Sequence, residues 1–142
     1  MRQCQLTTIE EDEEGLDPYI PIEVGSDRLS LHALADSGGH LNTMSWNVYQ
    51  KIPGLTFHPH ERIFTGSNGT ISTSAGYVEL PLYIKGSPCP HNFFVLPLED
   101  LDDQVILGIP WQRKYKAYIH WAENHIYFTS ECRVQLIQIS SW

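Results

Sequence analysis

The chain has 142 residues with 42% hydrophobic and 11% aromatic side chains, and its formal net charge at pH 7 is −8. This length suits one domain with a core of its own, and the apolar content excludes an intrinsically disordered chain. The negative charge argues against nucleic acid as a partner, because an acidic surface repels phosphate. No apolar run approaches the roughly 20 residues of a membrane span, so we expect no membrane partner either.

The first segment is acidic. Residues 10–14 read Glu-Glu-Asp-Glu-Glu and carry much of the net negative charge. We interpret residues 1–16 as a flexible acidic lead-in or linker, with a partner-binding tail as the alternative, and residues 17–142 as the folded domain. The N-terminus lacks the apolar segment of a signal peptide.

Two alternating segments follow. In residues 17–25 the apolar side chains occupy every second position, and residues 28–35 repeat this pattern after a short turn. Alternation of this kind predicts two half-buried strands joined as a hairpin. The second strand of that hairpin ends at Asp36. Residues 44–52 then predict a short helix, which Pro53-Gly54 would end.

The remainder of the chain is rich in strand signals. The sequence "GSNG" at 66–69 predicts a hairpin turn between two β-rich runs within residues 62–86. Further predicted strands cover, in chain order, residues 77–86, 91–98, 104–108, 117–121, 125–130 and 133–140, with a helical turn opened by Pro110. At least seven short strands with one or two short helices predict an all-β barrel or sandwich.

One short motif carries candidate chemistry. Asp36-Ser37-Gly38 follows a strand, although Asp and Gly are common turn residues and the motif alone is weak evidence. A second apolar strand, some seventy residues later, ends in Ile106-Leu107-Gly108. The two motifs together are more informative than either alone.

Taken with their surroundings, these motifs carry a family resemblance. "ALADSGGHLNTMS", "FFVLPLEDLDDQVILGIPW" and "YIHWAENHIYF" resemble, in that order, the retropepsin-like aspartic protease domain of LTR retroelements, above all gypsy-type retrotransposons and related pararetroviruses. The resemblance covers about residues 18–128. The sequence departs from the family at Gly39, where alanine is usual, and at His40, where a small polar residue is usual.

The resemblance implies a closed β-barrel with a flap hairpin, active as a homodimer. Asp36 would be the catalytic residue, Ser37, Gly38 and Gly39 would support its turn, and Ile106, Leu107 and Gly108 would pack beneath that turn. The flap would comprise Thr65, Gly66, Ser67, Asn68 and Gly69 and would close over an extended peptide. The implied activity is endopeptidase processing of a retroelement polyprotein, without cofactor or metal, in the cytoplasm or in retroelement particles.

The chemistry agrees with the implied dimer. Two carboxylates that share one proton can act as base and acid in peptide hydrolysis, as in aspartic proteases generally. The sequence contains one Asp-Ser-Gly, and the "DLDDQ" segment at 100–104 offers carboxylates without such a turn, so we interpret it as a loop. A second Asp36 must therefore come from a second chain.

Other interpretations remain open at this point. The same fold could serve as a dimerisation or peptide-binding module with little or no proteolysis, and a monomeric nucleic-acid-binding barrel is disfavoured by charge. His58-Pro59-His60 lacks a third ligand at suitable spacing for a metal and is interpreted as a polar loop. The strand at 133–140 could form a dimer interface or be a boundary segment of a longer polyprotein. Three widely spaced cysteines form neither a disulfide framework nor a metal pair, which favours a reducing, intracellular setting.

Overall fold

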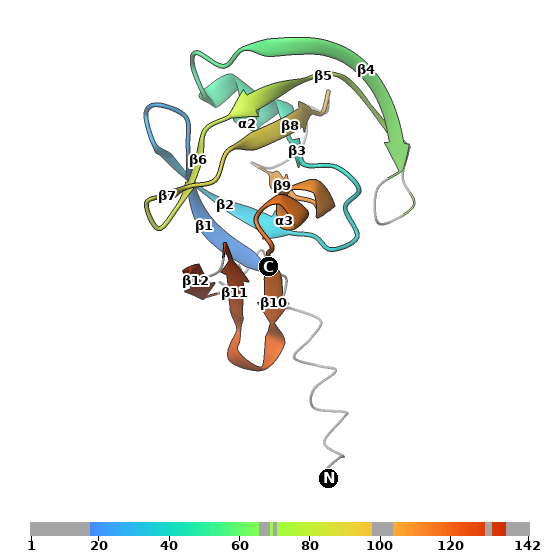
Figure 1. The fold of residues 1–142 in the computed structure, drawn as a ribbon. Coiled ribbons are helices and arrows are strands. Elements are labelled where there is room, and N and C mark those ends of the chain that lie inside the picture. The colour runs from blue at the N-terminus through green and yellow to red at the C-terminus, as the bar shows by residue number, and fades with distance from the viewer. Residues whose placement is uncertain (1–17, 66–68, 70, 98–103, 130–131, 136–142) are drawn as a thin grey trace, which may run out of the picture.

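The computed structural model describes residues 18–65, 69, 71–97, 104–129 and 132–135. These residues are mainly β-structure, with two short α-helices and one 3-10 turn (Figure 1). The strands are β1 (Tyr19–Val24), β2 (Leu29–Ala35), β3 (Thr43–Met44), β4 (Phe57–Thr65), β5 (Ile71–Leu80), β6 (Leu82–Ile84), β7 (Ser87–Pro88), β8 (His91–Val95), β9 (Val105–Leu107), β10 (Tyr118–His120), β11 (His125–Phe128) and β12 (Cys132–Gln135). The helices are α2 (Trp46–Lys51), α3 (Ile109–Lys114) and the 3-10 turn η1 (Trp121–Glu123).

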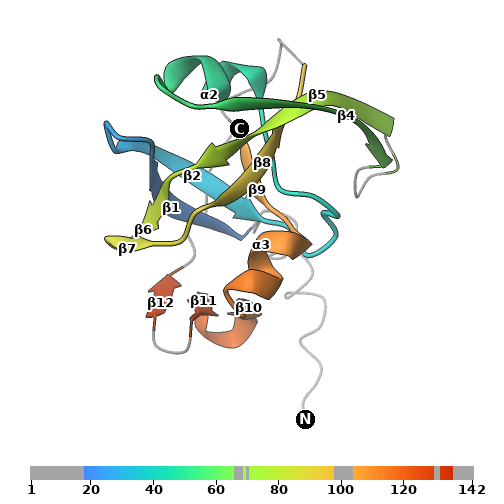
Figure 2. The same ribbon diagram turned by 45° about the horizontal axis from the view of Figure 1, so that its top comes forward.

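The strands form two sheets. Nine strands pair in the order β4-β5-β8-β3-β9-β2-β1-β6-β7, and β10, β11 and β12 form a separate three-stranded sheet. In both ribbon views the small sheet lies at one end of the molecule and the β4–β5 hairpin at the other (Figures 1 and 2). Most pairings are antiparallel, but β2 pairs in parallel with β9, and β3 with β8.

The all-β class is confirmed, but the expectation of a closed barrel is wrong. Within the described residues β4 and β7 lie at opposite edges of the nine-stranded sheet, and no ladder joins them. A barrel requires its first and last strands to pair. Here the edge strand β4 belongs to a long hairpin whose other strand, β5, pairs with β8 through residues 77–80. The sheet therefore stays open at that edge.

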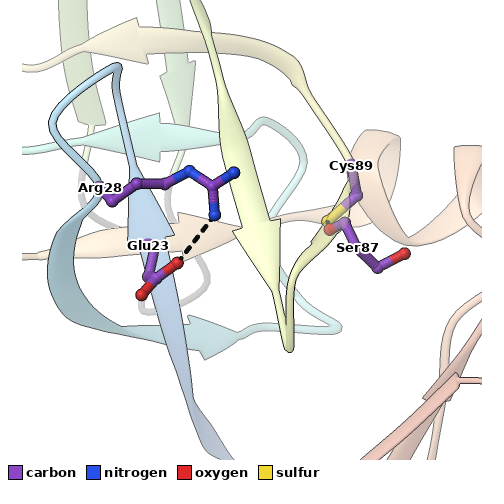
Figure 3. Close-up of polar contacts among 4 residues, drawn as sticks. All are labelled: Glu23, Arg28, Ser87 and Cys89. Atoms are coloured by element: carbon purple, nitrogen blue, oxygen red, sulfur yellow. Dashed lines mark hydrogen bonds and ion pairs between the residues drawn. The ribbon is translucent and has the colours of Figure 1, made fainter.

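The hairpin predicted before Asp36 is present. β1 and β2 pair antiparallel from Tyr19↔Leu34 to Val24↔Leu29. Their turn uses two left-handed positions, Gly25 with φ 78° and Arg28 with φ 54°. Arg28 donates a hydrogen bond to the Glu23 carboxylate at 3.2 Å, as Figure 3 shows, and its guanidinium lies 3.6 Å from the centre of the Tyr83 ring. The β1–β2 turn is thus held against β6.

The predicted helix at 44–52 is α2, shortened to Trp46–Lys51. Ser45 is its N-cap, and the Ser45 hydroxyl accepts the N–H of Val48 at 3.3 Å, a bond typical of this position. The same hydroxyl accepts the N–H of Gln104 at 3.3 Å. Ser45 therefore connects the start of α2 to the segment that enters β9.

Two strand boundaries differ from the sequence predictions. His58-Pro59-His60 lies within β4 rather than in a loop, and Pro59 is tolerated because β4 is an edge strand. The continuous strand predicted for 77–86 is broken at Pro81, which lacks the N–H that a ladder needs. The Pro81 carbonyl accepts the N–H of Gly25 at 2.9 Å instead.

The core lies against one face of the central strands. Trp111 of α3 is fully buried, and its indole N–H donates to the carbonyl of Cys89 at 3.1 Å. The thiol of Cys89 in turn approaches the carbonyl of Ser87 at 3.7 Å, and both residues are drawn in Figure 3. The largest fully buried side chains are Trp111, Phe93, Phe128, Ile20, Met44, Leu80, Leu82, Ile84, Leu107, Ile126, Val24 and Val48.

Candidate active site

Asp36 directly follows β2, at the end of a central strand. Its N–H donates to the carbonyl of Leu107 in β9 at 3.1 Å, which continues the parallel β2–β9 ladder by one bond. Its carboxylate Oδ1 accepts the N–H of Gly38 at 2.9 Å, and its carbonyl accepts the N–H of Gly39 at 3.0 Å. Such self-bonding is characteristic of Asp in turns, and it fixes the carboxylate relative to its own backbone.

The second motif lies against this turn. Gly108 follows β9, and the next N–H, that of Ile109, donates to the carbonyl of Gly39 at 2.8 Å. A Cβ on Gly108 would lie less than 3.0 Å from the carbonyl of Leu41 and from the carbonyl oxygen of Gly39. Two backbone segments therefore approach so closely that only glycine fits.

Asn42 joins three segments beneath the turn and was not predicted. Its side-chain Oδ1 accepts the N–H of Gly108 at 3.0 Å and the N–H of Trp111 at 3.1 Å. Its Nδ2 donates to the carbonyl of Asn92 in β8 at 3.1 Å. Asn42 is 2% exposed, so these bonds replace water for groups that solvent cannot reach.

Gln112 is a second site residue that sequence reasoning missed. From α3, its Nε2 donates to the carbonyl of Asp36 at 3.1 Å and to the carbonyl of Leu107 at 2.8 Å. The two carbonyls belong to neighbouring chain segments at the ends of β2 and β9. One amide group thus ties the backbone of Asp36 to the helix that follows the second motif.

The register places Asp36 on a defined face of the sheet. Residues paired across adjacent strands project to the same side, and alternate residues along one strand also do so. Asp36 follows Leu34 by two positions and shares its side. We call this side the Asp36 face; its cross-strand row consists of Leu34, Ile106, Thr43, Phe94 and Tyr77.

The β4–β5 hairpin continues the Asp36 face. Ile71 alternates in step with Tyr77 along β5, and Ile63 pairs with Thr73 on the same side. Ile63 is 70% exposed and Ile71 is 71% exposed. The end of this hairpin and the loop after Asp36 lie on the same side of the molecule in both ribbon views (Figures 1 and 2). Exposed isoleucines facing a candidate site are typical of a surface that becomes covered.

The structure brings most of the predicted site residues together. Ser37 and Gly38 are exposed in the turn, Gly39 is buried, and Ile106 and Leu107 lie in β9 with Gly108 directly after it. Of the predicted flap, Thr65 ends β4 and Gly69 has a φ of 85° with open space around it. Gly66, Ser67 and Asn68 lie outside the described residues, as do the acidic lead-in, most of the 100–104 loop and residues 136–140 of the C-terminal strand.

Metal and membrane features can be stated for the described part of the chain. There, no group of three His, Cys, Asp or Glu side chains could hold a metal ion. His58 instead contacts the Glu79 carboxylate, with Nε2 2.9 Å from Oε2. No helix among the described residues is long and apolar enough to cross a membrane.

Several side chains outside the Asp36 turn have shifted pKa values. Burial lowers the pKa of His91, at the start of β8, and the positive charge of Lys114 lowers it further. Burial raises the pKa of Tyr115, which ends α3. In the small sheet, a hydrogen bond from the Tyr127 hydroxyl lowers the pKa of Glu123.

Known proteins match this chain in family and in fold. The family model described as "PEG10/RTL1 protease domain" matches residues 32–135. The retroviral protease-like domain of Ddi1 from Leishmania major aligns with a TM-score of 0.62 at 15% identity, over 85% of this chain and 93% of that one. EIAV protease, in complex with the inhibitor HBY-793, aligns with a TM-score of 0.55 at 15% identity, over 69% and 86%. No curated protein matches the sequence.

These matches agree with the family resemblance that the two sequence motifs carry. The resemblance to retropepsin-like domains of gypsy-type retroelements is confirmed by the family model, which includes Asp36, Gly108 and the small sheet. The likeness to the two solved structures shows a retropepsin-like fold.

Proposed function

Because the chain belongs to the PEG10/RTL1 protease domain family, we propose that it is an aspartic endopeptidase that processes a retroelement polyprotein. Two Asp36 carboxylates, one from each chain of a homodimer, activate the attacking water. Substrate is an extended peptide that lies along the Asp36 face.

One observation carries this proposal: the way in which the Asp36 turn is held. Leu107, Gln112 and Gly39 fix the backbone around Asp36 through four hydrogen bonds of 2.8 to 3.1 Å. A surface turn without chemistry would not need a buried Asn42 and a close-packed Gly108 beneath it. A catalytic carboxylate does, because its geometry must be maintained within a fraction of an ångström.

The chemistry requires a second carboxylate. Two carboxylates about 3 Å apart cannot both ionise, so they share one proton. The ionised carboxylate removes a proton from water as that water attacks the peptide carbonyl, and the protonated carboxyl donates its proton to the developing oxyanion. As the C–N bond breaks, the carboxyl that took the water's proton passes it to the leaving nitrogen, and the other carboxylate recovers a proton from the hydroxyl of the tetrahedral intermediate. Since the sequence has one Asp-Ser-Gly, the second carboxylate is assigned to the same residue of a second chain.

Ser37, Gly38 and the β4–β5 hairpin have proposed roles in the same site. Ser37 is exposed beside Asp36 and is assigned to the contact between the two turns across the dimer axis. The Gly38 backbone leaves room for substrate. The hairpin acts as the flap, and its exposed Ile63 and Ile71 cover apolar substrate side chains and exclude water on closure.

The test is cleavage of an unstructured polyprotein-derived substrate at mildly acidic pH, with and without pepstatin. Wild type is expected to cleave and pepstatin to inhibit, since a tetrahedral mimic binds tightly only to a competent dyad. Asp36→Asn should abolish cleavage, whereas Asp27→Asn, in the exposed β1–β2 turn, should not. A folded, dimeric wild-type protein without activity would instead favour a dimerisation or peptide-binding module.

A further inference from the structure

A histidine-aromatic cluster lies on the Asp36 face, where β4, β5 and β8 meet. The rings of Tyr77 and Phe94 are 5.7 Å apart, and His60 meets the Phe94 ring at 5.9 Å in an edge-on arrangement. His58 stacks on Tyr77 at 4.9 Å. We call these four residues, together with Arg62, the β4 cluster.

The basic side chains of the β4 cluster differ in their partners. His58 is paired with Glu79, as described above. Arg62 pairs with Ser74, out of step with Tyr77, but its long side chain brings the guanidinium to 5.8 Å from the centre of the Phe94 ring. Within the described residues neither Arg62 nor His60 forms an ion pair, including with the neighbouring Glu61. The Arg62 guanidinium, at the exposed rim of the cluster, is therefore not paired with a carboxylate of the described residues.

The character of the Asp36 face changes with distance from Asp36. Leu34 and Ile106, nearest to it, are apolar and half-buried, and Thr43 follows. Phe94 comes next, three strand spacings or about 14 Å from Leu34, a span of about four residues in an extended peptide. A bound peptide would thus meet apolar side chains near the scissile bond and a cationic, aromatic surface farther along.

From this arrangement we propose that the β4 cluster is a specificity subsite for a carboxylate side chain of the substrate. An aspartate or glutamate about three or four residues from the scissile bond places its methylene groups on the Phe94 ring and its carboxylate against Arg62, with His60 beside it. This inference rests on the proposed function, because it takes the substrate peptide to lie along the Asp36 face.

A carboxylate fits the cluster better than other side chains do. It forms charge-assisted hydrogen bonds with a guanidinium that no carboxylate of the described part of the chain pairs. A lysine or arginine in the substrate would meet like charge at this position. A purely apolar side chain would cover Phe94 but would take water away from Arg62 without replacing its hydrogen bonds.

The first experiment is cleavage-site profiling with a library of unstructured peptides of random sequence. Wild type should cut preferentially where Asp or Glu stands three or four residues from the cut bond, by about tenfold over sites with Gln or Asn there. Arg62→Gln should lose this preference and still cleave, while Arg113→Gln, which removes one positive charge from the exposed end of α3, should retain it. Cleavage without acidic preference in wild type, or with an unchanged preference in Arg62→Gln, would overturn the assignment.

The second experiment separates the subsite from catalysis. Its probe is a labelled peptide of residues 5–16 of this chain, which contains the acidic run, and its control peptide carries Gln or Asn in place of the five acidic residues. Fluorescence anisotropy with the Asp36→Asn protein should show about tenfold tighter binding of the acidic peptide, and Arg62→Gln should remove that difference. Equal affinity for the two peptides would refute the subsite, even if the wild-type protein cleaves peptides. Selective binding of the acidic peptide by a protein that cleaves nothing would refute only the proposed protease function.

Discussion

Replacing Asn42 tests the claim that buried hydrogen bonds hold the candidate catalytic turn. In Asn42→Ala the N–H groups of Gly108 and Trp111 and the carbonyl of Asn92 lose their partner together. A buried polar group without a partner costs about 1–3 kcal/mol, so the two buried N–H groups alone cost at least about 2 kcal/mol, and the part-buried carbonyl of Asn92 adds to this. That is a large part of the 5–15 kcal/mol that is typical of a domain.

The assay is urea unfolding followed by tryptophan fluorescence, because Trp111 is buried close to Asn42. Asn42→Ala should lower the free energy of unfolding by about 3 kcal/mol. It should also reduce peptide cleavage under native conditions, since Gly108 packs directly against the turn. Asn92→Ala is the matched control: its side chain is exposed and only its backbone takes part, so we expect a change within about 0.5 kcal/mol. An Asn42→Ala protein as stable as the control would refute this reasoning.

Two further predictions concern glycine packing and pH. Gly108→Ala should destabilise the fold by about 3 kcal/mol or more, because its Cβ would meet backbone atoms that cannot rotate away. Gly39→Ala should be tolerated, since its Cβ would lie 3.4 Å from the nearest Asp36 atoms, an ordinary contact distance. Equal melting temperatures for the two variants would contradict this prediction. Because burial lowers the pKa of His91 in the folded state, the unfolded chain binds a proton first, so stability is complete above about pH 6.5 and is lost as the pH falls below it. His91→Gln should flatten that part of a plot of unfolding free energy against pH, and an unchanged plot would show that His91 does not contribute.

Local patterns predicted the parts of the fold that local physics determines. The alternation of residues 17–25 and 28–35 predicted the β1–β2 hairpin and hence the position of Asp36 at a strand end. These features depend on neighbours in sequence or on the chemistry of single residues.

Features that depend on distant partners were not predicted. β3 has two residues and exists because β8 and β9 pair on either side of it. The role of Asn42 depends on backbone groups 50 to 69 positions away, and that of Gln112 on Asp36, 76 positions away. No pattern around Asn42-Thr43-Met44 in the sequence signals a buried amide, because the neighbouring Thr43 is itself polar.

Edge position explains the remaining differences. The interpretation of His58-Pro59-His60 as a polar loop rests on the lack of a third metal ligand at suitable spacing, which says nothing about strand pairing. Strand β4 lies at the edge of the sheet, where proline is tolerated, and the ladder shifts between Pro59 and Arg62. Which strand becomes an edge follows from the pairing order, and that order also left the expected barrel open.

The most direct test of the central claim is a mixing experiment between wild type and Asp36→Asn. The two proteins are equilibrated together at fixed total concentration, so that dimers exchange, and peptide cleavage is measured against the fraction of wild type. If each site needs an Asp36 from both chains, activity falls as the square of that fraction, to about one quarter in an equal mixture. Activity that falls in direct proportion, to about one half, would contradict the account, because each chain would then carry a complete site of its own.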